Sequence, residues 1–294
     1  MKIFLTGATG YIGGAVAAAL RDAGHEVTAL VRDPKKAAAR LGEGIRLVAG
    51  DLATIDEQRN AIAASQVFVH TAASPERTAE LDELAIRALT RHHDNRYFLF
   101  TSGVWVLGNT GPAPADEVAP PRPIDLVKWR VQHERWVLEE ARDNFPTAVI
   151  RPGCVYGRRQ SLLRGWFKGA EKGEPIELVG SGTNHWAMIH IDDLARCYVR
   201  AVEKRAAGVL HAVDDTRATL RQCADAVVAA SGKKSEVRVK PLDEARKAMG
   251  PFADALAIDQ HVASGSTRSR LAWKPQKNFL DSVEEQWKEW RESK

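Results

Sequence analysis

The chain has 294 residues, of which 44 % are hydrophobic and 27 % charged, and these ordinary globular proportions argue against a disordered protein. The net charge of +4 is spread along the sequence without a block of Lys and Arg, so we expect no nucleic acid among its partners. Three widely spaced cysteines and the lack of a long apolar stretch exclude a disulfide framework and a membrane span, and they favour the cytoplasm.

The first half of the chain alternates between short apolar runs and amphipathic segments. Residues 2–6 are β-prone, a glycine-rich turn follows, and apolar residues from 12 to 23 recur with helical spacing. Further strands are expected at 26–31, 45–48, 67–71, 97–101 and 147–150, and helices at 55–64, 76–93 and 125–142. The five prolines of residues 111–123 predict a loop. Strands alternating with helices predict an α/β fold, a doubly wound parallel sheet of the Rossmann type over residues 1–153.

After residue 153 the alternation becomes less regular. Helices are expected at 162–172, from 192 onward, at 220–231 and at 281–290, with a short apolar run at 188–191. We therefore expect residues 154–294 to form mainly a smaller C-terminal substrate-binding region, with some segments returning to the Rossmann core.

The glycines of the first turn have the spacing G-x-x-G-x-x-G, between a predicted strand and a predicted helix. Glycine allows a sharp turn and a close approach of the backbone to a pyrophosphate, and the helix that follows directs free N–H groups at that anion. The turn therefore predicts a dinucleotide site in which the contacts are Gly7, Thr9, Gly10, Tyr11, Ile12 and Gly13.

The end of the second predicted strand bears on the choice of cofactor. An acid there binds the ribose hydroxyls of NAD, whereas an arginine pairs with the 2′-phosphate of NADP. The chain has Arg32 first and Asp33 second, and Lys36 adds positive charge nearby. A bidentate contact between arginine and phosphate suits this cluster, so NADP(H) is favoured and NAD(H) is possible.

Two later strand ends complete the adenine side of the predicted site. Asp51, followed by Leu52, is placed either to accept from the adenine amino group or to cap the helix that follows. The small residues Thr71, Ala72 and Ala73 allow the chain to pass close to a bound dinucleotide.

Several motifs together carry a resemblance to a known family. They are TGATGYIG at 6–13, GDL at 50–52, HTAAS at 70–74, FTSGVWVLG at 100–108, IRPGCVYG at 150–157 and IHIDDLA at 189–195. On these the chain resembles the extended and atypical short-chain dehydrogenase/reductases of the NAD-dependent epimerase/dehydratase group, and LVRDP at 30–34 resembles the version in NADP-using reductases. The resemblance implies that the remaining cofactor contacts are Thr101, Arg130, Pro152 and Gly153.

The resemblance also implies a catalytic hydroxyl residue and a Tyr-x-x-x-Lys pair, from which this chain departs. None of its tyrosines, at positions 11, 97, 156 and 198, is followed four residues later by lysine. Alignment on Glu134 puts Arg130 at the lysine position and Leu126 at the tyrosine position, on one face of the expected helix. Gly103 stands where the hydroxyl often lies, just after Ser102.

Three interpretations of function follow from this departure, in order of preference. The first is an NADPH-dependent reductase of a small carbonyl, enone or imine compound, because hydride transfer needs chiefly positioning. Its expected catalytic residues are Ser102, Arg130 and Tyr156, and Lys128 and His133 are further candidates for the proton donor. The second is a non-catalytic sensor of NAD(P)H. The third is a sugar-nucleotide epimerase or dehydratase, which is disfavoured because those reactions depend most on the missing tyrosine.

Other residues bear on the substrate side and on assembly. Three tryptophans are candidates either for an aromatic substrate pocket or for the core: Trp105, Trp129 and Trp186. Arg151, Arg158 and Arg159 are candidates to meet an anionic substrate group. His185 and His190 lack the spacing of a metal pair, so no metal is expected. Cys154 is expected to be a buried thiol. The resemblance implies a possible homodimer through the helix that carries Arg130.

Overall fold

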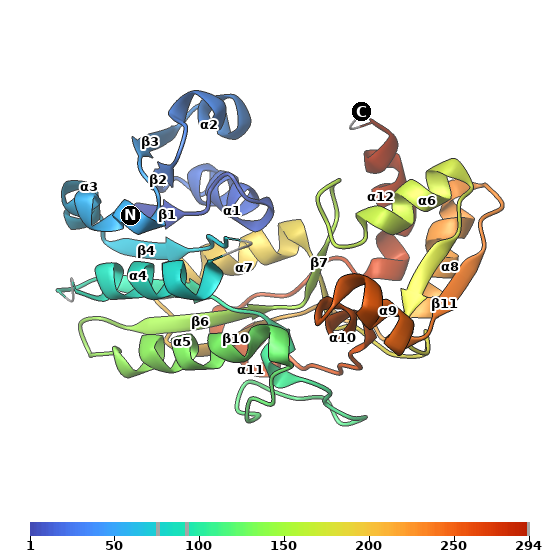
Figure 1. The fold of residues 1–294 in the computed structure, drawn as a ribbon. Helices are drawn as coiled ribbons and strands as arrows, with labels where there is room; N and C mark the ends of the chain where they lie inside the picture. The colour runs from blue at the N-terminus through green and yellow to red at the C-terminus, as the bar shows by residue number, and fades with distance from the viewer. Residues whose placement is uncertain (75–76, 92–93, 293–294) are drawn as a thin grey trace.

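The computed structural model describes residues 1–74, 77–91 and 94–292. Its centre is a seven-stranded sheet with the strand order β3-β2-β1-β4-β5-β6-β10 (Figure 1), and each pairing between neighbours is parallel. The strands are β1 (Lys2–Thr6), β2 (Glu26–Val31), β3 (Ile45–Ala49), β4 (Val67–His70), β5 (Tyr97–Thr101), β6 (Thr147–Pro152) and β10 (Gly208–Ala212). This strand order is that of a doubly wound Rossmann sheet, so the predicted fold class is confirmed.

Helices cover both faces of the sheet because the strand side chains alternate. Ile3 and Leu5 of β1 pack into one apolar cluster, whereas Phe4 between them packs into another on the opposite face. The first face is covered by α1 (Tyr11–Asp22), α2 (Pro34–Leu41), α7 (Ile191–Lys204) and α11 (Gly265–Leu271). The second face is covered by a 3₁₀ segment (Leu52–Gln58), α3 (Arg59–Ala63), α4 (Thr78–Thr90) and α5 (Lys128–Glu139).

A second lobe lies beside the carboxyl ends of these strands, on the right in Figure 1. It contains the parallel pairs β7 (Cys154–Tyr156) with β9 (Met188–His190) and β8 (Ile176–Val179) with β11 (Val237–Lys240). Its helices are α6 (Arg164–Lys172), α8 (Leu220–Ser231), α9 (Leu242–Met249), α10 (Phe252–Ala257) and α12 (Phe279–Glu292). β10 lies in the large sheet, and α7 and α11 cover one of its faces, although all three follow residue 153. The proposed domain boundary at residue 153 stays a prediction. Within the part of the chain described, no helix combines the length and apolar character needed to cross a membrane.

Two expected helices are shorter than their sequence patterns suggest. The expected helix at 55–64 is a 3₁₀ segment followed by the short α3. The expected helix at 125–142 begins with a 3₁₀ turn at 125–127. The last residue of this turn, Val127, has non-helical backbone angles, so α5 starts only at Lys128. It ends at Glu139 because the chain then reverses through two backbone hydrogen bonds between Arg142 and Phe145. The expected ends of α4, residues 76 and 93, lie outside the described residues.

Candidate functional site

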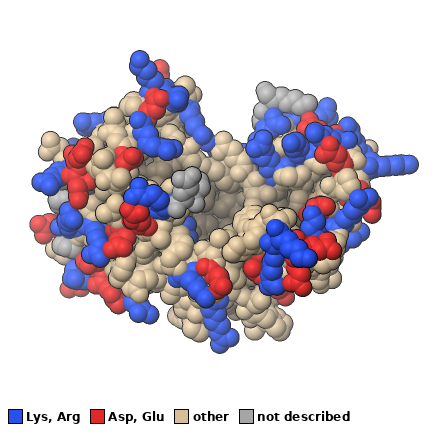
Figure 2. Space-filling model, viewed as in Figure 1, with Lys and Arg blue, Asp and Glu red and all other residues tan. Residues whose placement is uncertain are grey.

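A cavity of about 530 Å³ lies at the carboxyl ends of β1, β2 and β4, a size that suits a cofactor. These strand ends face the hollow between the two lobes, and Lys and Arg side chains gather on its upper rim (Figure 2). Most of the predicted cofactor contacts line the cavity: Gly7, Thr9, Gly10, Tyr11, Ile12, Gly13, Arg32, Asp51, Leu52, Thr71, Ala72 and Ala73. Its floor therefore has the small, backbone-rich surface that a dinucleotide needs.

The glycine turn is packed too closely for other residues. Gly7 has a φ of 80°, and its carbonyl accepts a hydrogen bond of 2.8 Å from the N–H of Gly10. A Cβ at Gly13 would lie 2.1 Å from that same carbonyl oxygen and 2.5 Å from Oγ1 of Thr71. Only glycine fits at both positions, and the N-terminus of α1 consequently opens onto the cavity.

The end of β2 presents arginine rather than an acid to the cavity. Arg32 lines the cavity and has no ion-pair partner among the residues that the structure describes. Asp33 instead caps α2 by accepting the backbone N–H of Lys36 at 3.1 Å, and its carboxylate lies 3.5 Å from Nζ of Lys36. The Lys36 side chain is 88 % exposed and does not line the cavity, so the geometry does not support its predicted contact.

Asp51 and Arg77 also line this part of the cavity. Asp51 caps the 3₁₀ segment, since its carboxylate accepts the N–H groups of Ala53 at 2.8 Å and Thr54 at 3.2 Å. The capping alternative is therefore the one that the structure shows, although Asp51 also faces the cavity. Sequence reasoning missed Arg77, because nothing in the local pattern indicates that the residue preceding α4 reaches the same cavity.

The end of β5 lies outside this cavity, and there the residues form a compact polar group. Oγ1 of Thr101 lies 2.7 Å from the hydroxyl of Tyr198, and Arg130 donates a hydrogen bond of 3.1 Å to the carbonyl of Thr101. The guanidinium of Arg130 also stacks 4.5 Å over the ring of Trp129. Ser102 is buried, and its Oγ has no hydrogen-bond partner among the described residues. This hydroxyl consequently has an unused hydrogen bond.

Pro152 ends β6, and Gly153 follows it. Both are buried, and the N–H of Gly153 donates to the carbonyl of Ala212 at 3.0 Å. A Cβ at Gly153 would lie 2.6 Å from the carbonyl oxygen of Ala187. These contacts explain a glycine at 153 by packing, so a contact of either residue with the cofactor stays a prediction.

A buried hydrogen-bonded chain lies under the cavity and was missed by sequence reasoning. Nδ1 of His70 is 2.7 Å from Oγ1 of Thr6, and Nε2 of His70 is 3.1 Å from the Asp82 carboxylate. The His70 ring stacks on Phe100 at 5.7 Å. Because Thr6 also lines the cavity, this chain orients the threonine hydroxyl at the end of β1. Its members come from three separate elements, so no local sequence motif predicts it.

The candidate proton donors differ in their burial and in their partners. Tyr156 is fully buried between His190 and Phe279, and burial raises the pKa of its hydroxyl, with the nearby Asp214 adding to the effect. Lys128 is 64 % exposed and paired with Asp125.

His133 lies between the rings of Trp129 and Trp136, and burial lowers its pKa. None of these three lines the cavity, and neither does Ser102. Ser102 differs from them in its place at the carboxyl end of β5, a central strand of the large sheet.

The structure also changes the expectations for Leu126, Arg151 and Arg158. Leu126 lies in the 3₁₀ turn, so it does not continue the helical face of Arg130 and Glu134. Arg151 is 4 % exposed and forms a bidentate ion pair with Glu134, which removes it from substrate contact. Arg158 pairs at 2.7 Å with Asp192 instead.

The tryptophans serve mainly in packing. Trp186 is buried, stacks on Trp166 at 5.9 Å and donates its indole N–H to the carbonyl of Leu256. Trp105 meets Phe252 edge-on at 6.3 Å. Cys154 is buried as expected, and burial raises the pKa of its thiol to about 12.

Comparisons with known proteins agree with this architecture. An uncharacterized protein of Schizosaccharomyces pombe is 28 % identical over 95 % of this chain and 97 % of its own length. A 3-diazoavenalumate denitrifying reductase of a Streptomyces species is 29 % identical over 94 % of this chain and 96 % of its own. The crystal structure of human epimerase family protein SDR39U1 with NADPH superposes with a TM-score of 0.80 at 22 % identity, covering 98 % and 99 % of the two chains.

The family match covers the whole Rossmann sheet. Residues 3–213, from β1 to just beyond β10, match the description "NAD dependent epimerase/dehydratase family". The glycine turn, the parallel sheet and the cavity at its carboxyl edge are the parts of a dinucleotide-binding Rossmann fold. The chain therefore belongs to the NAD-dependent epimerase/dehydratase family.

Proposed function

We propose that the chain is an NADPH-dependent reductase of a small carbonyl, enone or imine compound that works without the tyrosine and lysine usual in its family. The observation that carries the proposal is the end of β2. There Arg32 lines the cavity, whereas Asp33 is engaged as the cap of α2 and is not among the lining residues. An arginine in this place suits the 2′-phosphate of NADPH, whereas an acid would suit the ribose hydroxyls of NADH.

Two observations support the reductase assignment: the names of relatives and the absence of a Tyr-x-x-x-Lys pair. The Streptomyces relative, similar over nearly its whole length, is named a reductase. Epimerases and dehydratases of sugar nucleotides depend on the tyrosine that is here Leu126, a residue in the 3₁₀ turn without a proton to transfer. Reduction of a polarised double bond makes smaller demands, because it needs a positioned hydride donor and one proton.

The chemistry can be assigned to residues at the end of β5. A reduced dinucleotide held by the glycine turn and Arg32 would supply the hydride. Ser102 donates a hydrogen bond to the substrate oxygen or nitrogen, and this bond strengthens as negative charge develops there. Burial lowers the pKa of Arg130, but arginine remains protonated and adds positive charge beside Thr101. Water supplies the proton that the family's tyrosine would otherwise deliver.

The cofactor assignment is tested with Arg32→Ala and the matched control Lys36→Ala. Loss of a charge-assisted contact with phosphate is expected to raise the Kd of NADPH about 10- to 100-fold in Arg32→Ala, with little change for NADH. Lys36→Ala removes a neighbouring positive charge that does not line the cavity, so it should bind NADPH nearly as the wild type does. Equal weakening of NADPH and NADH in Arg32→Ala would show that Arg32 does not read the 2′-phosphate.

The activity is tested by following loss of NADPH absorbance with a panel of aldehydes, ketones, enones and imines. Ser102→Ala should lower kcat by about 10²- to 10³-fold while the Kd of NADPH is retained. Tyr156→Phe should retain kcat, because Tyr156 lies in an apolar cluster of the second lobe, packed against His190 and Phe279. Tight NADPH binding without turnover of any compound would favour the sensor instead. Conversion of sugar nucleotides without net NADPH consumption would favour an epimerase.

A further inference from the structure

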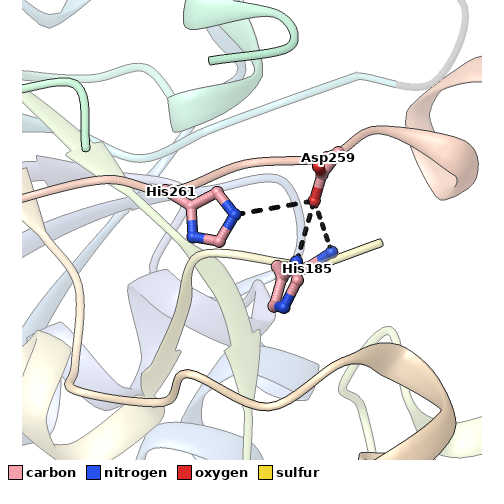
Figure 3. A group of neighbouring side chains, drawn as sticks. All are labelled: His185, Asp259 and His261. Carbon is pink, nitrogen blue, oxygen red and sulfur yellow. Dashed lines mark hydrogen bonds and ion pairs between the residues drawn. The ribbon is translucent and has the colours of Figure 1, made fainter. Parts of the chain in front are cut away.

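Two histidines and an aspartate meet between two segments of the chain that are far apart in sequence (Figure 3). His185 lies between β8 and β9, whereas Asp259 and His261 lie between α10 and α11. The Asp259 carboxylate oxygen is 3.0 Å from Nδ1 of His185 and 3.9 Å from Nε2 of His261. The three ligand atoms all lie within 4.8 Å of one another. None of the three residues lines the dinucleotide cavity.

The aspartate is held in place by His185. Its carboxylate oxygen lies 2.7 Å from the backbone nitrogen of His185 and 3.0 Å from Nδ1 of the same residue. The side chains of His185, His261 and Asp259 are 25 %, 21 % and 46 % exposed, so a small cation can reach them from solvent.

We propose that His185, Asp259 and His261 form a binding site for a divalent transition-metal ion of the zinc type. Two imidazole nitrogens and one carboxylate oxygen are a ligand set that Zn²⁺ accepts, with water in the fourth position. Ligands of one tetrahedral zinc lie about 3.3 Å apart, given bonds of about 2.0 to 2.1 Å. The three atoms therefore need to close by no more than about 1.5 Å, which rotation of partly exposed side chains provides.

The surrounding backbone indicates what such an ion would do. Asp259 donates its N–H to Asn109, and His261 donates its N–H to Thr110. Between them, the side chain of Gln260 donates to the carbonyls of Val104 and Gly108. The ion would therefore fasten the segment of His185 to the loop that follows Ser102. This inference stands independently of the proposed reductase activity.

The competing explanation is that hydrogen bonds alone link the two segments, without a metal ion. Substitution of His261 distinguishes between the two explanations. His185 already makes hydrogen bonds with Asp259, so its loss would disturb either arrangement. Nε2 of His261, at 3.9 Å, is too far from the carboxylate for a hydrogen bond, and the backbone bond of His261 survives substitution. His261→Ala consequently removes a metal ligand without removing a hydrogen bond of the link.

The test uses the full chain without a histidine tag, titrated with Zn²⁺ by calorimetry and with Co²⁺ by visible absorption. We expect one Zn²⁺ per chain, ligand-field bands of four-coordinate Co²⁺, and a melting temperature several degrees higher with saturating Zn²⁺. His261→Ala should weaken Zn²⁺ binding at least about 10-fold and abolish the Co²⁺ bands. His25→Ala, a change at a histidine near the N-terminus, should behave as the wild type. Binding by His261→Ala equal to the wild type, or no stoichiometric binding by the wild type, would overturn the proposal.

Discussion

For several single residues the sequence allows either a structural role or a role in ligand binding or catalysis, and the structure shows the structural one. Asp33 and Asp51 both follow strands at the edge where a dinucleotide would bind, and both cap the segments that begin after them. Tyr156, a candidate proton donor, lies in the apolar interior of the second lobe. Arg32, by contrast, lines the cavity, and the hydroxyl of Ser102 has no hydrogen-bond partner among the described residues.

Asp214, buried beside Tyr156, gives a prediction for the pH dependence of stability. Burial raises its pKa to about 6, above the value of about 3.9 that an unfolded chain would show. The folded state therefore binds the proton more tightly, and stability falls as the pH rises from about 4 through about 6. Asp214→Asn keeps an acceptor for the N–H of Thr216 and removes the charge. Its stability relative to the wild type should rise across this range by about 3 kcal/mol.

Urea denaturation at several pH values measures that difference. Asp215→Asn is the control, because Asp215 is 54 % exposed and paired with Arg268 at the surface. A difference between Asp214→Asn and the wild type that stays constant from pH 4 to pH 7 would contradict the assigned pKa.

At the scale of elements, α5 starts later than its sequence pattern suggests. Its expected first turn is a separate 3₁₀ segment, so the tyrosine position of the family does not lie on the same helix as Arg130. The helix is nevertheless firmly attached to the sheet. The ion pair between Glu134 of α5 and Arg151 of β6 is almost fully buried, with Arg151 also beside His211 of β10.

Glu134→Gln tests this attachment of α5 to the sheet. The substitution leaves the Arg151 charge buried without a compensating carboxylate, which is expected to lower the free energy of unfolding by about 3 to 5 kcal/mol. Glu285→Gln breaks an exposed pair with Lys277 and should cost less than about 1 kcal/mol. Chemical denaturation of both variants compares the two costs. A loss of less than about 1 kcal/mol in Glu134→Gln would mean that the pair does not anchor α5.

At the scale of the whole molecule, the large sheet is built from both halves of the sequence. β10 adds to the edge of the sheet beyond β6, and α7 covers the face formed by the first strands. Leu194, Tyr198 and Val202 of α7 are completely buried in the same apolar cluster as Ile3 and Leu5. The nucleotide-binding part of the chain is therefore incomplete without residues that follow position 153.

A fragment of residues 1–153 is consequently expected not to fold alone. It would expose the apolar surface that α7 and α11 cover, and leave β6 as an uncovered edge of the sheet. Circular dichroism and NADPH titration of the fragment, with the full chain as the control, test this expectation. A fragment that melts cooperatively and binds NADPH would show instead that residues 1–153 are an independent domain.

The first six strands of the large sheet, the glycine turn and the Rossmann class follow from the sequence alone, because each depends on side-chain periodicity or on glycine over a few neighbouring residues. β10, the seventh strand of that sheet, was not expected from the sequence. The pairing of His70 with Asp82, the burial of Arg151 against Glu134 and the meeting of His185 with Asp259 and His261 were decided only by the tertiary structure. These groups join residues that are separated in the chain. Whether a polar side chain meets a partner, an apolar wall or a cavity depends on long-range packing, which the local pattern does not contain.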